Sequence, residues 1–233
     1  MGRSNGCARG GRQEVLNRCA PAQHASIGGL QKRDGLEIEA SGLREACIQK
    51  GLEIISLEGL EKLSLREVAR QLKVSHQAPY KHFASRDHIL AEIVARVFAH
   101  FAQFLDQNPK TDDPDADLAL MGVAYLTYAA RYPLQYRLMF SSPLPDGTSH
   151  PLMMKEARHA FELLCNALKR KDKKLHRARM SEEVVLDALF IWSGLHGLAS
   201  ISSSSIADTL GIKKKTFEKA HSHLLMRFGT GIG

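Results

Sequence analysis

Apolar residues recur every third or fourth position along almost the whole chain. The pattern begins with Ile48, Leu52 and Ile55 and is still present at Leu224 and Phe228. This spacing places apolar side chains on one face of an α-helix, whereas a half-buried strand would alternate apolar and polar residues. No segment shows a convincing two-residue alternation. The sequence therefore predicts an all-α fold.

Composition limits the class of protein. The 233 residues, 44% hydrophobic and 24% charged, fit one large domain or two small ones with a sizeable core. The net charge of +7 favours an acidic partner, with nucleic acid as first candidate and an anionic membrane as second. Cys7, Cys19, Cys47 and Cys165 form no C-x-x-C pair. We therefore expect no disulfide framework, no metal site and no cofactor.

The chain shows no sign of membrane insertion or export. No uninterrupted apolar stretch approaches the roughly 18 residues of a membrane span, and the first thirty residues lack a signal-peptide core. We expect a cytoplasmic protein that does not bind a membrane. Residues 1–35 lack periodicity and predict a flexible basic leader, with contact to DNA as a basic arm as the alternative.

Breaks in the pattern divide the rest into two domains. Residues 36–86 contain three short helical segments and are expected to bind DNA, and residues 87–233 are expected to form a larger helical domain. The predicted helices cover 43–58, 65–72, 75–82, 87–106, 114–131, 153–168, 184–201 and 217–228.

The segment 64–86 carries the clearest functional signal. Ser64 and Ser75 are good N-caps for two short helices, with a break at Lys73 and Val74 between them. This segment contains five basic residues and one acidic residue. Two short helices joined by a tight turn, with a basic and polar second helix, match a helix-turn-helix. Pro79 predicts that the second helix is short and slightly irregular.

Side-chain chemistry suggests how this segment reads DNA. Gln77 can pair with adenine, His76 can bond to guanine or phosphate, and Ala78 can contact a thymine methyl. The remaining members suit backbone phosphates, which set position rather than sequence. The predicted DNA-binding residues are Ser64, Arg66, Ser75, His76, Gln77, Ala78, Tyr80, Lys81, His82 and Arg86.

The run from Arg44 to Leu90 resembles the DNA-binding domain of TetR family regulators. The motifs that carry the resemblance are Gly59, Ser64, Arg66, Val68-Ala69, Val74-Ser75, Tyr80-Lys81-His82-Phe83 and Ser85-Arg86-Asp87. In the second half, the segments 125–140 and 192–197 are similar to a TetR subgroup named for a Trp-His-Gly signature. The two regions together cover most of residues 43 to 202.

The resemblance implies a homodimer formed by the last two long helices, about 182–202 and 213–228. Independently, the segment 184–201 is too apolar on every side to face water. The resemblance also implies an effector pocket, although the same residues could form an ordinary core. The predicted effector-binding residues are Met121, Tyr125, Tyr128, Phe140, Phe161, Trp192 and His196. The basic run 169–179 is interpreted as a solvated loop, with a second nucleic-acid patch as the alternative.

These observations predict a repressor that a small molecule releases from a palindromic operator. A helical protein-interaction module, or a non-specific DNA-binding protein without effector response, remains the alternative. No nucleophile elbow, phosphate loop or H-E-x-x-H motif is present, so we do not expect an enzyme.

Overall fold

The computed structural model describes residues 40–140, 142–171 and 182–231. Their regular structure is entirely helical, which confirms the predicted fold class for this part of the chain. The predicted leader, residues 1–35, lies outside the described residues, and so does most of the basic run 169–179.

The N-terminal helices form a small helical group. It comprises α2 (Ala40–Glu58), the 3-10 turn η1 (Leu60–Lys62), α3 (Leu65–Leu72), the 3-10 turn η2 (Pro79–Lys81) and the start of α4 (Arg86–Leu105). Ser64 caps α3 as the sequence predicts, because its side chain accepts a hydrogen bond from the Glu67 amide. Ser85 caps α4 in the same way by accepting from the His88 amide.

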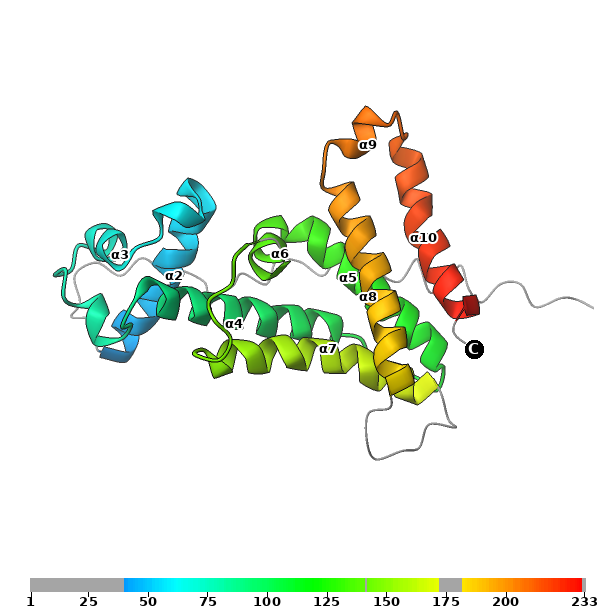
Figure 1. Cartoon of the computed structure of the whole chain (residues 1–233), viewed down its shortest axis with the longest axis horizontal. Coiled ribbons are helices and arrows are strands. Elements are labelled where there is room, and N and C mark those ends of the chain that lie inside the picture. The colour runs from blue at the N-terminus through cyan, green and yellow to red at the C-terminus, as the bar shows by residue number, and fades with distance from the viewer. Residues whose placement is uncertain (1–39, 141, 172–181, 232–233) are drawn as a thin grey trace, which may run out of the picture. The chain divides into compact units, whose positions relative to one another are not determined.

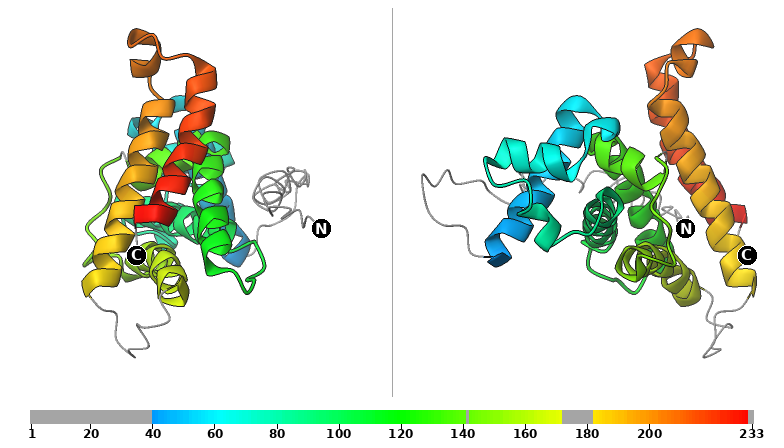
Figure 2. Two further views of the ribbon diagram at one scale, coloured as in Figure 1. Left: turned by 90° about the vertical axis from the view of Figure 1, so that its right-hand side faces the viewer. Right: turned by 60° about the vertical axis from the view of Figure 1, so that its left-hand side comes forward.

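The larger group of helices begins with α4 itself. It continues with α5 (Pro114–Arg131), α6 (Pro133–Phe140), α7 (Pro151–Lys171), α8 (Glu182–Ser202), α9 (Ile206–Thr209) and α10 (Lys214–Gly231). α4 and α7 run side by side, and α8 and α10 pair with each other (Figures 1 and 2).

α4 is the central helix of the core. Residues on several of its sides are buried, from Ile89 and Leu90 near its start to Phe101 and Leu105 near its end. The described residues belong to one compact unit, and α4, which begins at the predicted domain boundary, contacts α2 as well as α5, α6 and α7. The helix therefore belongs both to the N-terminal group and to the larger group.

A glycine allows α2 to approach α4 closely. A Cβ atom at Gly51 would lie 3.0 Å from Ile93 Cδ1 and 3.3 Å from Leu63 Cδ1. The missing side chain at Gly51 therefore permits close packing in the middle of α2.

Three segments differ from the sequence prediction in detail. The region 75–82 forms turns and the short η2 rather than a continuous helix. α6 was not predicted, because the sequence prediction ends a helix before Pro133 and places no other helix before residue 153. Tyr132 leaves the helical conformation at φ −125° and ψ 59°, and Pro133 then starts the new helix. The four-residue α9 was also not predicted.

Two helices, α4 and α8, are long and apolar enough to cross a membrane by length and composition. The uninterrupted-run criterion used for the sequence did not detect them, because each contains charged residues. Most of α4 lies inside the protein, as expected for a core helix. α8 packs one face against the core and leaves the other exposed.

Candidate DNA-binding surface and ligand cavity

The segment between α3 and α4 is held by its backbone and by one buried proline. Lys73 ends α3 in the left-handed conformation at φ 56°, which turns the chain sharply. The Ala78 amide then donates to the Ser75 carbonyl over 3.0 Å, and the Phe83 amide donates to the Pro79 carbonyl over 3.0 Å. Pro79 and Phe83 are buried. The proline thus anchors this segment and also interrupts a regular helix.

The polar residues around Pro79 point outward. His76, Gln77 and Lys81 are exposed, and Tyr80 keeps 45% of its surface exposed. Of the other predicted DNA-binding residues, Arg66 and Ser75 are exposed, whereas Ser64, Ala78, His82 and Arg86 are half-buried. Exposed residues on both sides of the buried proline therefore share one region of the surface.

Arg86 has an intramolecular role that the sequence did not suggest. Its Nε donates to the Leu63 carbonyl over 3.0 Å and its Nη2 donates to the Leu60 carbonyl over 2.9 Å. Leu60 is the first residue of η1 and Leu63 follows its last residue, so the guanidinium ties η1 to the start of α4. Arg86 Nη1 lies 3.6 Å from a carboxylate oxygen of Asp87.

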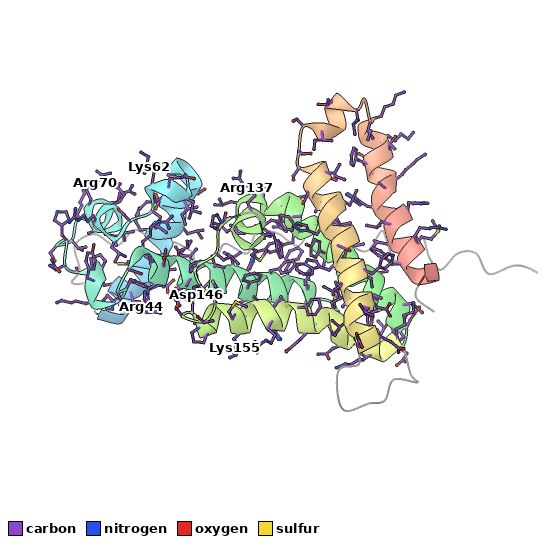
Figure 3. All side chains as sticks on the ribbon, in the orientation of Figure 1. Arg44, Lys62, Arg70, Arg137, Asp146 and Lys155 are labelled. Carbon is purple, nitrogen blue, oxygen red and sulfur yellow. The ribbon has the colours of Figure 1, made fainter. Side chains whose placement is uncertain are left out.

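Not every positive charge near this surface is available to a partner. Arg70 donates from Nε to Glu67 over 2.8 Å, and this bond with the one from Gln71 lowers the pKa of Glu67 to about 2. Glu67 thus remains ionised and offsets Arg70. Arg66, Lys73 and Lys81 are exposed, and no hydrogen bond or ion pair from their side chains was found. Figure 3 shows Lys62 and Arg70 on the same N-terminal group of helices.

A cavity of about 300 Å³ lies between α4, α5, α6, α7, α8 and α10. This volume is at the lower end of the range for small-molecule sites. The lining is almost wholly apolar and rich in aromatic rings. Among the described residues that line it, only Asp115, Tyr125 and Trp192 have a nitrogen or oxygen in the side chain.

Five of the seven predicted effector-binding residues lie around this cavity: Met121, Tyr125, Phe140, Phe161 and Trp192. The other two do not line it. Tyr128 is fully buried on another side of α5, where its hydroxyl lies 3.0 Å from His100 Nδ1. His196 lines a more open groove on the other side of Phe140 and Trp192.

The sequence missed several cavity residues that the structure brings in from distant helices: Phe98, Leu105, Leu195, Leu225 and Phe228. Phe98, Phe101 and Leu105 are three and four residues apart on α4, so the helical spacing was a usable signal. It could not show which of the apolar faces meets the cavity. α10 can approach α8 closely because Gly194 has no side chain: a Cβ atom there would lie only 2.6 Å from the Phe228 ring.

A short chain of hydrogen bonds leads from the cavity to the groove. Trp192 Nε1 donates to the Tyr125 hydroxyl over 3.3 Å, and the hydroxyl oxygens of Tyr125 and Tyr136 lie 3.0 Å apart. The Tyr136 hydroxyl lies 2.7 Å from His196 Nδ1. Burial raises the pKa of both tyrosines and lowers the pKa of His196. All four groups are therefore uncharged near neutral pH.

The exposed side of α8 is apolar. Leu186, Phe190 and Ile201 are 57%, 56% and 42% exposed. Gly197 lies in the same series of positions, and a Cβ atom there would meet nothing within 4 Å. In the left view of Figure 2, α8 and α10 lie at the front of the molecule. Phe190 contacts Phe228 of α10, with ring centroids 5.4 Å apart, and still keeps more than half of its surface exposed. We refer to Leu186, Phe190, Gly197 and Ile201 as the α8 outer face.

Comparison with known proteins agrees with this architecture. The family model for bacterial regulatory proteins of the tetR family matches residues 48–93, from α2 into α4. The model for the tetracycline-repressor-like C-terminal domain matches residues 118–218, from α5 into α10. The two matches together span more than half of the chain. The chain belongs to the TetR family.

Individual TetR relatives are distant in sequence. The chain is 23% identical over 167 residues to the HTH-type transcriptional regulator Rv0681 of Mycobacterium tuberculosis, covering 72% of this chain and 73% of that protein. A solved structure of a protein of unknown function from Rhodococcus sp. RHA1 has a TM-score of 0.66 at 20% identity, over 81% of this chain and 94% of the other. A structure described as a tetR family transcription regulator from Shewanella sp. PV-4 has a TM-score of 0.59 at 15% identity, over 81% and 96%. The protein is therefore a DNA-binding transcriptional regulator of the TetR family.

Proposed function

We propose that this regulator is a repressor that binds a palindromic operator as a homodimer and leaves it when a small molecule enters the cavity. The observation that carries the proposal is the course of α4. The helix begins at the Ser85 cap beside the DNA-binding segment, and its Phe98, Phe101 and Leu105 line the cavity. A ligand that displaces these side chains displaces the same helix that supports the DNA-binding segment.

The exposed set around Pro79 provides the contacts to DNA. His76 and Gln77 suit base edges, while Tyr80 and Lys81 suit phosphates. Arg86 acts mainly by holding η1 against α4, since two of its nitrogens already donate to carbonyls. The partner is double-stranded operator DNA, and the protein acts in the cytoplasm without enzymatic activity.

The α8 outer face supports the homodimer. Its members follow one another at intervals of four, seven and four residues along one side of the helix, and Gly197 leaves room for a second helix to approach. α10 extends the surface with Met226, which is 59% exposed. A two-fold dimer would place its two DNA-binding segments roughly 34–36 Å apart, one turn of DNA.

The first experiment is a fluorescence-anisotropy titration against the DNA that flanks the protein's own gene. The wild type should bind with an affinity that falls as salt rises and that resists non-specific competitor. The Tyr80→Ala/Lys81→Ala variant should bind about tenfold more weakly or worse. Lys155→Ala is the control, because it removes a charge from α7 and should leave affinity unchanged.

Different failures would point to different functions. Equal binding to random duplex, with no preference for any palindrome, would favour a non-specific DNA-binding protein. Absence of DNA binding at low salt would favour a helical protein-interaction module and would contradict the proposal.

A further inference from the structure

We propose that the effector is an uncharged, mostly apolar molecule carrying one hydroxyl group, and that Tyr125 and Trp192 bind this hydroxyl inside the cavity. The inference rests on the proposed effector response and names the chemistry that the site would recognise.

The lining of the cavity favours an uncharged ligand. Among the described residues that line it there is no lysine, arginine or histidine. Asp115 is the one charged residue, but its side chain is 62% exposed and pairs with Lys171 over 3.2 Å. An ionic ligand would lose its hydration without gaining a buried counter-charge, which is costly. Aromatic rings alone offer a cation a weaker compensation.

The same lining does not favour a pure hydrocarbon, because one part of the wall is polar. Tyr125 and Trp192 both line the cavity and bond to each other over 3.3 Å, a long hydrogen bond. On the far side of the wall, the Tyr125 hydroxyl lies 3.0 Å from the Tyr136 hydroxyl and 3.4 Å from His196 Nδ1. The polar end of the cavity therefore consists of one hydroxyl and one indole N–H.

The direction of the hydrogen bonds decides which ligand group fits. If His196 Nδ1 accepts from Tyr136, the tyrosine hydrogens point toward His196 and Tyr125 offers the cavity a lone pair. If His196 Nδ1 instead carries the hydrogen, the order reverses and Tyr125 offers its hydrogen to the cavity. In both cases the single N–H of Trp192 makes only a long bond of 3.3 Å to Tyr125 and can be shared with the ligand. A hydroxyl group can donate and accept, so it fits either arrangement, whereas a carbonyl can only accept.

The test uses four probes with one skeleton and different end groups: n-butylbenzene, 4-phenyl-1-butanol, 4-phenylbutyrate and 4-phenylbutylamine. Trp192 is the only tryptophan in the chain and lies in the cavity wall, so its fluorescence reports occupancy directly. The alcohol should bind at least as tightly as the hydrocarbon, although it loses more hydration. It should also bind about tenfold or more tightly than either ion.

Two matched variants separate the hydroxyl contact from general packing. Tyr125→Phe keeps the ring. It should weaken the binding of the alcohol by about three- to tenfold and leave the affinity for the hydrocarbon nearly unchanged. Tyr128→Phe removes an equally buried hydroxyl that bonds to His100 outside the cavity, and should change neither. Circular dichroism of both variants checks that the fold is intact.

Three results would overturn the inference. Tightest binding of 4-phenylbutyrate or 4-phenylbutylamine would mean that the site selects an ion. An alcohol affinity that Tyr125→Phe does not change would remove the hydroxyl contact. Failure of all four probes to bind would show that the cavity does not take molecules of this class. Operator binding measured on the same preparation keeps each of these outcomes distinct from failure of the proposed function.

Discussion

The carbonyl groups of Leu60 and Leu63 receive hydrogen bonds from a single side chain, Arg86. Gly59 precedes them at φ 98°, a conformation that favours glycine, so the chain reverses sharply there before α3 begins. At the scale of single residues, the DNA-binding segment is thus supported by a few side chains that make specific polar contacts.

Arg86→Ala should lower the free energy of unfolding by about 1–2 kcal/mol, because the Leu63 carbonyl loses its donor and the Leu60 carbonyl keeps only the bond from the Leu63 amide. Arg86→Lys should recover little of this, since an ammonium group cannot reproduce the two-donor fork. Urea unfolding curves provide the measurement. Arg66→Ala is the control: this exposed arginine should affect DNA binding but change stability by less than about 0.5 kcal/mol. Equal stability of Arg86→Ala and wild type would contradict the assigned role.

Asp117 holds a second polar junction and predicts a pH effect. Its side chain is 6% exposed and accepts from Arg170 Nη1 over 2.7 Å and from the Thr111 amide over 3.0 Å. Burial opposes ionisation, but the bonds from Thr111 and Arg170 outweigh it, so the pKa of Asp117 is lowered from 3.8. A carboxyl with a lowered pKa in the folded state contributes stability above its unfolded pKa and loses it as pH falls.

Asp117→Asn should therefore destabilise the protein by about 1–2 kcal/mol at pH 7. The difference from wild type should shrink as the pH is lowered below about 4, where the wild-type carboxylate also becomes protonated. Urea unfolding across this pH range measures the difference. A difference in the free energy of unfolding between the two proteins that stays constant with pH would show that the charge of Asp117 does not contribute to stability.

At the scale of helices, the proposed dimer contact at the α8 outer face predicts an effect of substitutions at Gly197 that the structure of a single chain does not predict. Gly197→Ala and Gly197→Leu both have room within one chain, since no atom lies within 4 Å of the added Cβ, and alanine is a better helix former than glycine. If a second α8 packs there, Gly197→Leu should raise the dimer dissociation constant by about tenfold or more, and Gly197→Ala far less. Sedimentation velocity over a range of concentrations provides the measurement. Dimers of Gly197→Leu as stable as wild type would move the interface elsewhere.

Most helices could be predicted from sequence, and the exceptions have local causes. Ser64, Ser85 and Pro114 mark helix starts by chemistry that acts within one turn, so the predicted and observed starts agree within a residue. α6 was not predicted because Pro133 was interpreted only as the end of the preceding helix, whereas it is also the first residue of a new one. The region 75–82 was predicted to be irregular, but Pro79 is deeply buried and the segment departs further from a helix than expected.

The site was predictable only in part, because a cavity depends on contacts between distant segments. Aromatic and methionine residues on α5, α6, α7 and α8 were chosen by composition, and five of them surround one space. Tyr128 has the same local sequence pattern as Tyr125. It lies three residues further along α5, however, and its hydroxyl lies beside His100 instead of lining the cavity. Phe228 lies more than a hundred residues from Tyr125 in sequence, and only the packing of α10 shows that both line the cavity.

At the scale of the whole molecule, the proposed effector response requires that α4 couple the cavity to the DNA-binding segment. Coupling between two sites through one helix is reciprocal, so a ligand that weakens operator binding must itself bind less tightly when the operator is present. We predict that 4-phenyl-1-butanol lowers operator affinity, and that operator DNA lowers the alcohol's affinity by the same factor, about five- to 150-fold. Anisotropy and Trp192 fluorescence measure the two sides independently. Unequal factors would show that the ligand acts at more than this one site.

Burial of Pro79 between exposed neighbours has a consequence for how such regulators diverge. The residue that fixes the turn faces the core, while His76 and Gln77 on one side and Tyr80 and Lys81 on the other face outward. Substitutions at the outward positions therefore leave the anchor intact. After gene duplication, one copy can acquire a new operator through changes at two or three codons while its cavity stays as inherited.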